Sequence, residues 1–363
     1  MGGLGLMLRR RAIQAHPTIS EGGYILSADK GDPEVFRVLM EKGVSSDGVG
    51  ITKQDAANVK SIGTWFRNNT TIVSFNELRF FTSVISLDNY AFSGCSKLAN
   101  IDLSNVVSIG ASCFIGNAIQ VDTLDLSKVT YIGSNGLAGI SVRELNISGL
   151  VSMTPVSAAN DATYGKKAVL ESVIFAEELQ TIPMMSFYDY KALKTLKKTN
   201  NVTLVDRAAF EGCSSLTSID FPNLANLGQY AFMKSGLEEV KSLGLVISLP
   251  QQAFMNCTKL RSVTLPSGLT TIGSQCFNTC NLQSIDIGEN VTSIVNSAFE
   301  KNTLMEYAIC RALTPPKLAN NYVFAQTNNC PIYVPDASID AYKGASYWSN
   351  LSSRIKPLSE YQG

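Results

Sequence analysis

The stretch VDRAAFEGCSSLTSIDF, residues 205–221, decides the fold because its pattern returns along most of the chain. Two further clear copies are LDNYAFSGCSKLANIDL at residues 87–103 and LPQQAFMNCTKLRSVTL at residues 249–265. An aromatic residue or leucine stands at the centre of each unit, at Phe66, Phe92, Phe114, Leu137, Phe187, Phe210, Phe232, Phe254, Phe277, Phe299 and Phe324. From Phe187 to Phe299 the successive steps are 23, 22, 22, 23 and 22 residues. A fixed period of this length is the sequence signature of a stacked-repeat protein.

Each unit ends in the pattern L-x-x-I-x-L, which predicts one short strand per unit. The last two apolar residues lie two positions apart, so both point to the same face of an extended segment. One unit cannot bury that face alone, but stacked units share a continuous core. We therefore expect a leucine-rich repeat solenoid over residues 59–335, with about 12 coils of 22–23 residues and a parallel β-sheet, mostly β and loop. The 50 residues between Leu137 and Phe187 predict two units plus an insertion near residues 158–168.

The full unit, I-G-x-x-A-F-x-x-C-x-x-L-x-x-I-x-L-P, resembles the BspA-like (Treponema pallidum-type) leucine-rich repeats of bacterial surface proteins. The resemblance covers about residues 59–335. It implies a non-catalytic recognition protein that takes part in adhesion, with a protein or glycan on a host or bacterial surface as its partner.

The N-terminal end is expected to close the solenoid with short helices, since the first coil would otherwise expose its apolar face. Residues 31–58 are predicted to form this helical cap. Asp32 is expected as the N-cap of its first helix, Pro33 as the first helical residue and Gly43 as the C-cap. Residues 1–30 match no element and are expected to form a flexible arm.

The C-terminal end shows a second capping pattern. A last strand is expected over residues 331–336, and residues 336–363 are expected to form a helical cap. Within this cap, the apolar spacing from Ala337 to Arg354 predicts one amphipathic helix. The ending also resembles the terminal segment of family members from gut Bacteroidales.

Composition and motifs argue against enzymes, metal proteins and nucleic-acid binders. Thirty basic residues balance 30 acidic ones, so no strong field attracts nucleic acid. The one histidine, His16, lies in the predicted arm, which removes histidine-based triads and metal sites from the solenoid. No P-loop, GxSxG, HExxH or EF-hand pattern occurs, and no apolar run is long enough to span a bilayer. We expect no catalytic residue, no cofactor and no metal.

The eight cysteines follow the repeat and not a disulfide pattern. Four of them occupy the same position, three residues after the central phenylalanine: Cys95, Cys213, Cys257 and Cys280. A cysteine fixed by repeat register behaves as a small buried apolar residue, so we expect free thiols. For Cys310 and Cys330, near the last coils, the sequence is consistent both with free thiols and with a disulfide bridge.

Candidate ligand contacts are the strand residues that should point outward. They are Asp102, Asp125, Asn146, Asp220, Lys241 and Asp286. Neighbouring coils lie about 4.8 Å apart, so Asp102 and Asp125 are expected to approach each other. These positions are expected to be solvated side chains or weak ligand contacts. Tyr164, in the expected insertion, is a further candidate, because tyrosine is favoured at interfaces.

The N-terminal sequence bears on where the solenoid is displayed, on a phage virion or on a bacterial cell. Residues 1–8 are apolar and Arg9, Arg10 and Arg11 follow, which reverses the order of a secretory signal. The stretch LMLRRRAI, residues 6–13, resembles the starts of repeat proteins encoded in phages and prophages of gut Bacteroidales. These features favour a phage virion component, associated with tail or capsid, anchored through the three arginines and docked through residues 1–58. The alternative is a bacterial cell-surface or secreted adhesin.

Overall fold

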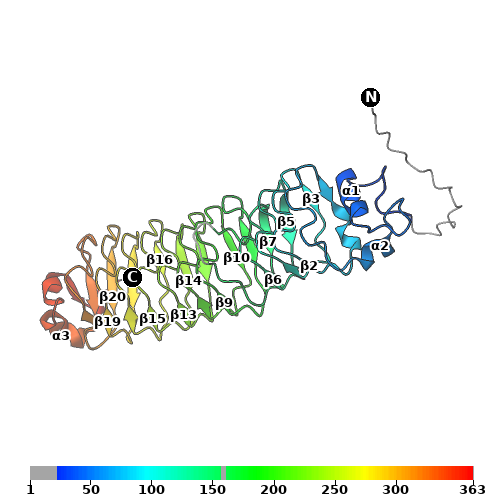
Figure 1. Cartoon of the computed structure of the whole chain (residues 1–363). Helices are drawn as coiled ribbons and strands as arrows, with labels where there is room; N and C mark the ends of the chain where they lie inside the picture. The colour runs from blue at the N-terminus through cyan, green and yellow to red at the C-terminus, as the bar shows by residue number, and fades with distance from the viewer. Residues whose placement is uncertain (1–22, 157–160, 363) are drawn as a thin grey trace, which may run out of the picture.

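The computed structural model of the chain describes residues 23–156 and 161–362. The coils stack along one long axis, with helices α1 (Pro33–Glu41) and α2 (Lys53–Asn58) at one end and helix α3 (Ile339–Gly344) at the other (Figure 1). The expected solenoid with short helices at both ends is confirmed. The three arginines at positions 9–11 lie outside the described residues.

The strands of the described residues fall into two rows that run along the solenoid (Figure 1). The first strand row comprises β1 (Ser74–Phe75), β3 (Asn100–Ile101), β5 (Gln120–Asp125), β7 (Ser141–Asn146), β8 (Ser172–Ile174), β10 (Thr195–Lys197), β12 (Ser218–Asp220), β14 (Glu239–Ser242), β16 (Ser262–Val263), β18 (Ser284–Ile287), β20 (Tyr307–Cys310), β22 (Ile332–Val334) and β23 (Ile355–Pro357). The second strand row comprises β2 (Ser86–Leu87), β4 (Ser108–Ile109), β6 (Tyr131–Ile132), β9 (Thr181–Ile182), β11 (Leu204–Val205), β13 (Asn226–Leu227), β15 (Ser248–Leu249), β17 (Thr271–Ile272), β19 (Ser293–Ile294) and β21 (Lys317–Leu318). Short 3-10 helices cover Asn76–Phe80, Asp336–Ser338, Ser349–Arg354 and Leu358–Glu360.

The second row corrects the expectation of one strand per coil. Its strands are two residues long and pair in parallel, for example Leu204 with Thr181 and with Asn226. Alternation over two residues gives no periodic signal in a sequence. These strands exist because stacking brings neighbouring backbones into register.

The first row is interrupted, and this interruption matters for the site. Within the described residues it forms separate sheets, in the orders β1-β3, β10-β8-β7-β5, β12-β14-β16 and β18-β20-β22-β23. All the pairings are parallel, as expected. Adjacent coils therefore lose sheet pairing between β3 and β5, between β10 and β12, and between β16 and β18.

A ladder of aromatic rings forms the centre of the core. Stacked phenylalanine pairs have centroid separations of 5.2 to 5.7 Å, as in Phe92–Phe114, Phe210–Phe232 and Phe254–Phe277. Parallel rings at this separation are a favourable offset arrangement. Each ring covers the next from Phe66 to Phe114 and again from Tyr164 to Phe324, and Leu137 fills the ring position between these two runs.

Tyr164 belongs to this ladder, which corrects its predicted role. Its side chain is 0% exposed and its ring centroid lies 5.4 Å from that of Phe187. The two steps from Leu137 to Tyr164 and on to Phe187 are 27 and 23 residues, so the two expected units are present. Residues 161–168 are part of the regular coil and not of an insertion. The expectation that Tyr164 is an exposed ligand contact is therefore wrong.

The turn that carries each ring has its own hydrogen-bond ladder. The residue two positions before the ring takes a left-handed conformation in nine coils, with φ between 52° and 63°. The backbone N–H of the ring residue then donates to the next coil, as from Phe210 to Ala231 at 2.8 Å and from Phe232 to Ala253 at 2.9 Å. This ladder makes the turn surface a rigid base for the side chains that it carries.

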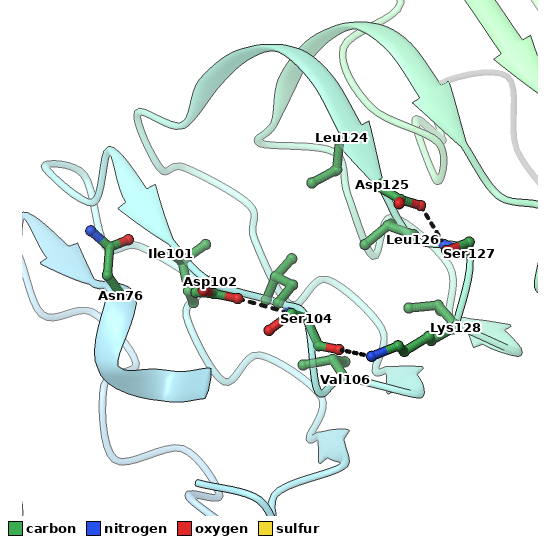
Figure 2. Close-up of a pocket in the computed structure, with 12 residues that line it drawn as sticks. Asn76, Ile101, Asp102, Ser104, Val106, Leu124, Asp125, Leu126, Ser127 and Lys128 are labelled. Atoms are coloured by element: carbon green, nitrogen blue, oxygen red, sulfur yellow. Dashed lines mark hydrogen bonds between the residues drawn. The ribbon is translucent and has the colours of Figure 1, made fainter. Parts of the chain in front are cut away.

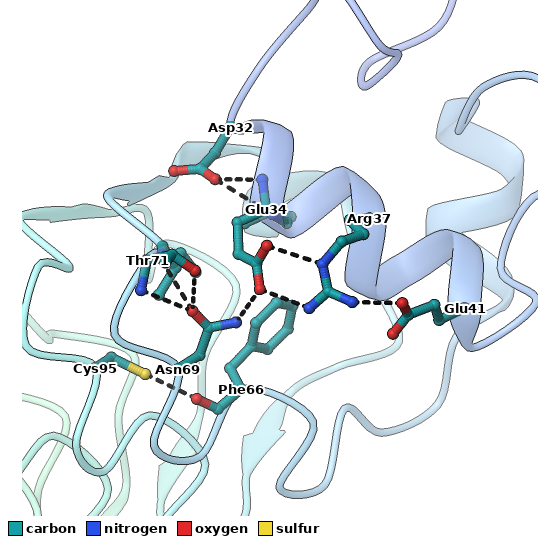
Figure 3. Close-up of polar contacts among 10 residues, drawn as sticks. Asp32, Glu34, Arg37, Glu41, Phe66, Asn69, Thr71 and Cys95 are labelled. Atoms are coloured by element: carbon teal, nitrogen blue, oxygen red, sulfur yellow. Dashed lines mark hydrogen bonds and ion pairs between the residues drawn. The ribbon is translucent and has the colours of Figure 1, made fainter.

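The N-terminal cap is joined to the first coil by carboxylates (Figure 3). Oδ1 of Asp32 caps α1, as predicted, by accepting from the backbone N–H of Glu34 and Val35 at 2.9 and 3.2 Å. Asn69 occupies the cysteine position of the coil next to the cap, and its amide donates to the Glu34 carboxylate at 2.6 Å. The Arg37 guanidinium bonds the same carboxylate and lowers the pKa of Glu34 to about 2.

Two boundaries of the cap differ from the prediction. Lys42 is the C-cap of α1, and Gly43 follows it with a φ of 71°. Residues 24–30, expected in the arm, pack on the cap instead, where the fully buried Leu26 bridges to Ile51.

The C-terminal cap differs from the single helix that was expected. Helix α3 ends at Gly344, Tyr347 takes a φ of 66°, and a 3-10 helix follows. This break lets Trp348 turn inward, where its indole N–H donates to the Pro316 carbonyl at 2.7 Å beside Phe324. Strand β23 then extends the sheet beyond β22, which is the predicted last strand.

Candidate functional site

The thiols contribute to the core and offer no reactive group at the surface. All eight cysteines are buried and free, as expected, and Cys310 and Cys330 are not bridged. In the repeat position, the thiol donates to the carbonyl of the phenylalanine one coil earlier, at 2.9 Å from Cys95 and at 3.1 Å from Cys257. Burial raises the pKa of Cys257 to about 12 and that of Cys95 to about 11. Such thiols stay protonated and are poor nucleophiles.

Asp102 and Asp125 both line one hollow on the first strand row (Figure 2). We call it the strand-break hollow; its volume is about 410 Å³. Ile101 and Leu124 contribute apolar surface to it, and Lys128 contributes an ammonium group. The hollow therefore combines acceptors, a donor and an apolar floor.

The hollow exists because β3 and β5 belong to different sheets. Within the described residues, no backbone hydrogen bond joins the two strands, so their coils separate at this point. Each aspartate holds the turn after its strand, with Asp102 accepting from the N–H of Ser104 at 3.0 Å and Asp125 from that of Ser127 at 2.9 Å. The Lys128 ammonium crosses the gap and donates to the Ser104 carbonyl at 3.1 Å (Figure 2).

Asp102 is held in its charged form. Its side chain is 26% exposed and its carboxylate lies 3.5 Å from the guanidinium of Arg79. Burial acts to raise the pKa of Asp102, but hydrogen bonds from Ser104 and Arg79 outweigh it and lower this pKa below the usual value. A carboxylate held ionised is a hydrogen-bond acceptor and a poor general acid.

Asp220 and Lys241 lie near the second break of the row, which separates β10 from β12. They line a smaller hollow of about 230 Å³ beside Leu196 and Thr199. The Thr199 hydroxyl donates to the Asp220 carbonyl at 2.7 Å and bridges the gap between β10 and β12. The register of β12 against β14 also shifts after Ile219.

The other two candidates of the first row are engaged in contacts between coils. Asn146 donates to the Asp125 carboxylate at 2.9 Å. Asp286 forms a two-pronged ion pair with Arg311, with the closest atoms 2.7 Å apart. Both contacts support the coil stack and leave less freedom for a ligand.

A row of ion pairs that the sequence analysis missed lies between the two hollows. Arg143 lies 3.8 Å from Asp122 and 3.5 Å from Glu171, and Lys194 lies 2.8 Å from Glu171. The alternating charges of four successive coils, at one repeat position, were the signal that could have found it. Exposed pairs of this kind contribute little to stability, so their effect is mainly on the charge pattern of the surface.

Within the described residues, no group of three or more histidine, cysteine, aspartate or glutamate side chains is placed to hold a metal ion. None of the helices in this part of the chain is long and apolar enough to cross a bilayer. The two hollows can accept and donate hydrogen bonds, which is the chemistry of a binding surface.

Comparison with known proteins agrees with the repeat pattern. A family model described as "BspA type Leucine rich repeat region (6 copies)" matches residues 54–164, 157–242 and 225–351. No curated protein matches the sequence.

Several solved structures are similar at low identity. A leucine-rich repeat protein from Bacteroides ovatus shares 20% identity with a TM-score of 0.47, covering 81% of this chain and 86% of its own. A leucine rich cell surface protein from Faecalibacterium prausnitzii shares 17% identity with a TM-score of 0.31, covering 82% and 86%. The pneumococcal vaccine antigen PcpA shares 15% identity with a TM-score of 0.33, covering 76% of each chain. None of these descriptions names a phage, so the expectation of a virion component gains no support.

Proposed function

The chain belongs to the family of BspA-type leucine-rich repeat proteins, and from this premise we propose that it is a non-catalytic binding protein of the bacterial surface. Its ligand is a glycan or protein of a host or neighbouring cell. The strand-break hollow is the main contact site. The proposal takes up the adhesin alternative of the sequence analysis, and the location corresponds to the description of the F. prausnitzii protein.

The observation that carries the proposal is the break between β3 and β5. Within each sheet paired strands close the surface of the first row, but at this break a hollow of about 410 Å³ opens with Asp102 and Asp125 at its wall, larger than the hollow of about 230 Å³ at the second break. Carboxylate acceptors and the Lys128 ammonium suit the hydroxyl and amide groups of glycans and peptides. Repeated weak contacts along the rest of the row would add to the affinity.

The binding test uses a variant that fills the hollow without removing a side-chain hydrogen bond. Ser127 is exposed, lines the hollow, and bonds Asp125 only through its backbone N–H. Ser127→Trp is therefore expected to weaken binding at least tenfold on an array of bacterial and mammalian surface glycans and a panel of extracellular host proteins. The matched control is Ser267→Trp, at an exposed position outside the hollows described above. Equal binding by both variants would reject the hollow as the site.

The location is tested separately, by fractionating a culture of the source and quantifying peptides from residues 23–362 by mass spectrometry. Enrichment in the cell envelope or the culture medium is expected. Enrichment with phage-sized particles would overturn the surface location in favour of a virion.

A further inference from the structure

A second surface, on the turns that carry the ring ladder, is unusually rich in methionine and tyrosine. Two adjoining hollows of about 510 and 570 Å³ share Met184 in their walls. Four of the nine methionines of the chain line them: Met153, Met184, Met185 and Met233. Tyr188 and Tyr230 line the first hollow, and the 54% exposed Val151 lines the second. We call this area the methionine surface.

Three of the four methionines of this surface contribute little to the core: Met184, Met185 and Met233 are half-buried, whereas Met153 is 4% exposed and packs in the core. Behind them the ladder is complete, because Phe187 and Phe210 stack at 5.4 Å and Phe210 and Phe232 do the same. The repeat itself supplies an internal comparison at the position two residues before the ring. The next three coils carry polar residues there, Gln252, Gln275 and Ser297, and tyrosine recurs there at Tyr90 and Tyr322. Methionine occupies this position and the one before it in a single coil, as Met185 and Met184, so the methionine character is specific to this surface.

The backbone under this surface is rigid while its side chains are adaptable. The N–H of Met185 donates to the Arg207 carbonyl at 3.0 Å, and that of Ala208 donates to the Gln229 carbonyl at 2.9 Å. Methionine has three rotatable bonds and a polarisable sulfur, and it is over-represented at surfaces that bind varied apolar side chains. A fixed base with flexible walls suits such a ligand.

The charges that line the hollows are mainly negative. Glu178, Asp206 and Glu211 contribute carboxylates, and Arg207 is the one cation in the walls of the two hollows as described. Within the described residues, the half-buried Glu211 carboxylate forms no ion pair, and its burial raises its pKa. The Arg207 guanidinium lies over the ring of Tyr230, 5.6 Å from its centroid. A bound segment would thus meet an apolar surface with a negative rim.

We propose that the methionine surface binds an extended peptide segment of a partner protein, with bulky apolar side chains next to lysine or arginine. The two hollows extend over four successive coils, from the coil of Tyr164 to that of Phe232. Three spacings of about 4.8 Å give roughly 14 Å, the length of about four extended residues. This site lies on the turns and is independent of the strand-break hollow and of the function proposed above.

The test uses the full chain on an array of random-sequence octapeptides. Bound peptides are expected to be enriched in lysine or arginine beside leucine, phenylalanine, methionine or isoleucine. Binding should weaken as salt rises, because screening reduces the attraction to the negative rim. Enrichment of acidic peptides, or no enrichment at all, would overturn the proposal.

Two variants separate the apolar contribution from the charge contribution. The double variant Met184→Gln and Met233→Gln is expected to lower the affinity for the best-binding basic and apolar octapeptide about tenfold. Glu178→Lys with Glu211→Lys is expected to turn the preference from basic towards acidic octapeptides. Both pairs lie outside the ring ladder, so far-UV circular dichroism and the melting temperature should change little.

The matched control replaces one exposed apolar and one exposed acidic residue elsewhere, Leu245→Gln with Glu239→Gln. It is expected to bind the same octapeptides as the unmodified chain. An unchanged preference in the double lysine variant, or an equal loss in the control, would show that the methionine surface is not the site.

Discussion

Removing the Asp32 carboxylate should detach the N-terminal cap from the first coil. Oδ1 of this residue caps helix α1. Its Oδ2 accepts from the backbone N–H of Val73 at 2.8 Å and from that of Ser74 at 2.9 Å, at the start of β1. The side chain is buried, and within the described residues no strand pairs with β1 on the side of the cap to accept from those two N–H groups. One carboxylate therefore joins the cap to the solenoid.

The expected loss of stability follows from the four hydrogen bonds that the Asp32 carboxylate accepts. Loss of an N-cap costs about 1 kcal/mol. Leaving the two N–H groups of β1 without a charged acceptor adds about 2–3 kcal/mol, so Asp32→Ala should cost about 3–4 kcal/mol. Asp32→Asn keeps one carbonyl oxygen but turns an amide donor towards two N–H groups. We therefore expect Asp32→Asn to keep either the cap of α1 or the contact with β1 and to lose the other, which should lower the stability by about 2–3 kcal/mol.

The loss should be local, because each coil of a solenoid contacts only its neighbours. Hydrogen exchange resolved by segment is the suitable assay. In Asp32→Ala, exchange over residues 33–41 and 73–78 should accelerate about 30-fold or more, which corresponds to at least about 2 kcal/mol of local stability. Exchange over residues 262–287 should stay unchanged.

Asp29→Asn is the matched control, because Asp29 is exposed and accepts no hydrogen bond among the described residues. If Asp32→Ala leaves both segments within about twofold of the unmodified chain, the proposed junction is wrong. If residues 33–41 alone accelerate, the carboxylate caps the helix but does not hold β1.

Two further predictions concern the core. Tyr164→Phe should change the free energy of unfolding in urea by less than about 1 kcal/mol, whereas Tyr164→Ala should lower it by about 3–5 kcal/mol by leaving a gap in the ladder; equal effects would contradict the ladder position. Burial raises the pKa values of Cys113 and Cys257 to about 12, so the folded chain holds both thiols in the neutral form. The free energy of unfolding should therefore be unaffected by these thiols below about pH 9, and it should fall as the pH rises towards 12, because the unfolded chain can ionise them and the folded chain cannot. At pH 8, a thiol reagent should label the cysteines only after unfolding in urea; fast labelling of the folded chain would contradict their burial.

The features that repeat from coil to coil were predictable from the sequence. The ring positions, the four cysteines at the same repeat position and the inward strand residues follow from a period of 22–23 residues, because stacking places equal positions above one another. The same period places Asp102 and Asp125 at the strands of neighbouring coils, where both line one hollow. The N-cap role of Asp32 was also predictable, since capping is a local property.

The features that depend on contact between particular coils were not predictable. Tyr164 looked like an insertion residue because four or five extra residues precede it and shift the period, but its ring packs against Phe187 in the core. The C-terminal helix breaks at Gly344 because Trp348 gains a buried position beside Phe324. In both cases burial of a large ring outweighs the local pattern.

The sequence by itself determined that this chain is a leucine-rich repeat solenoid with a buried ring ladder and free thiols, because each coil repeats the same local interactions. Only the tertiary structure decided where the solenoid opens. The hollow at Asp102 and Asp125 depends on whether two neighbouring strands come close enough to exchange backbone hydrogen bonds. The methionine surface depends on which turns lie side by side over four coils. Both are properties of the distance between backbones, which no single repeat encodes.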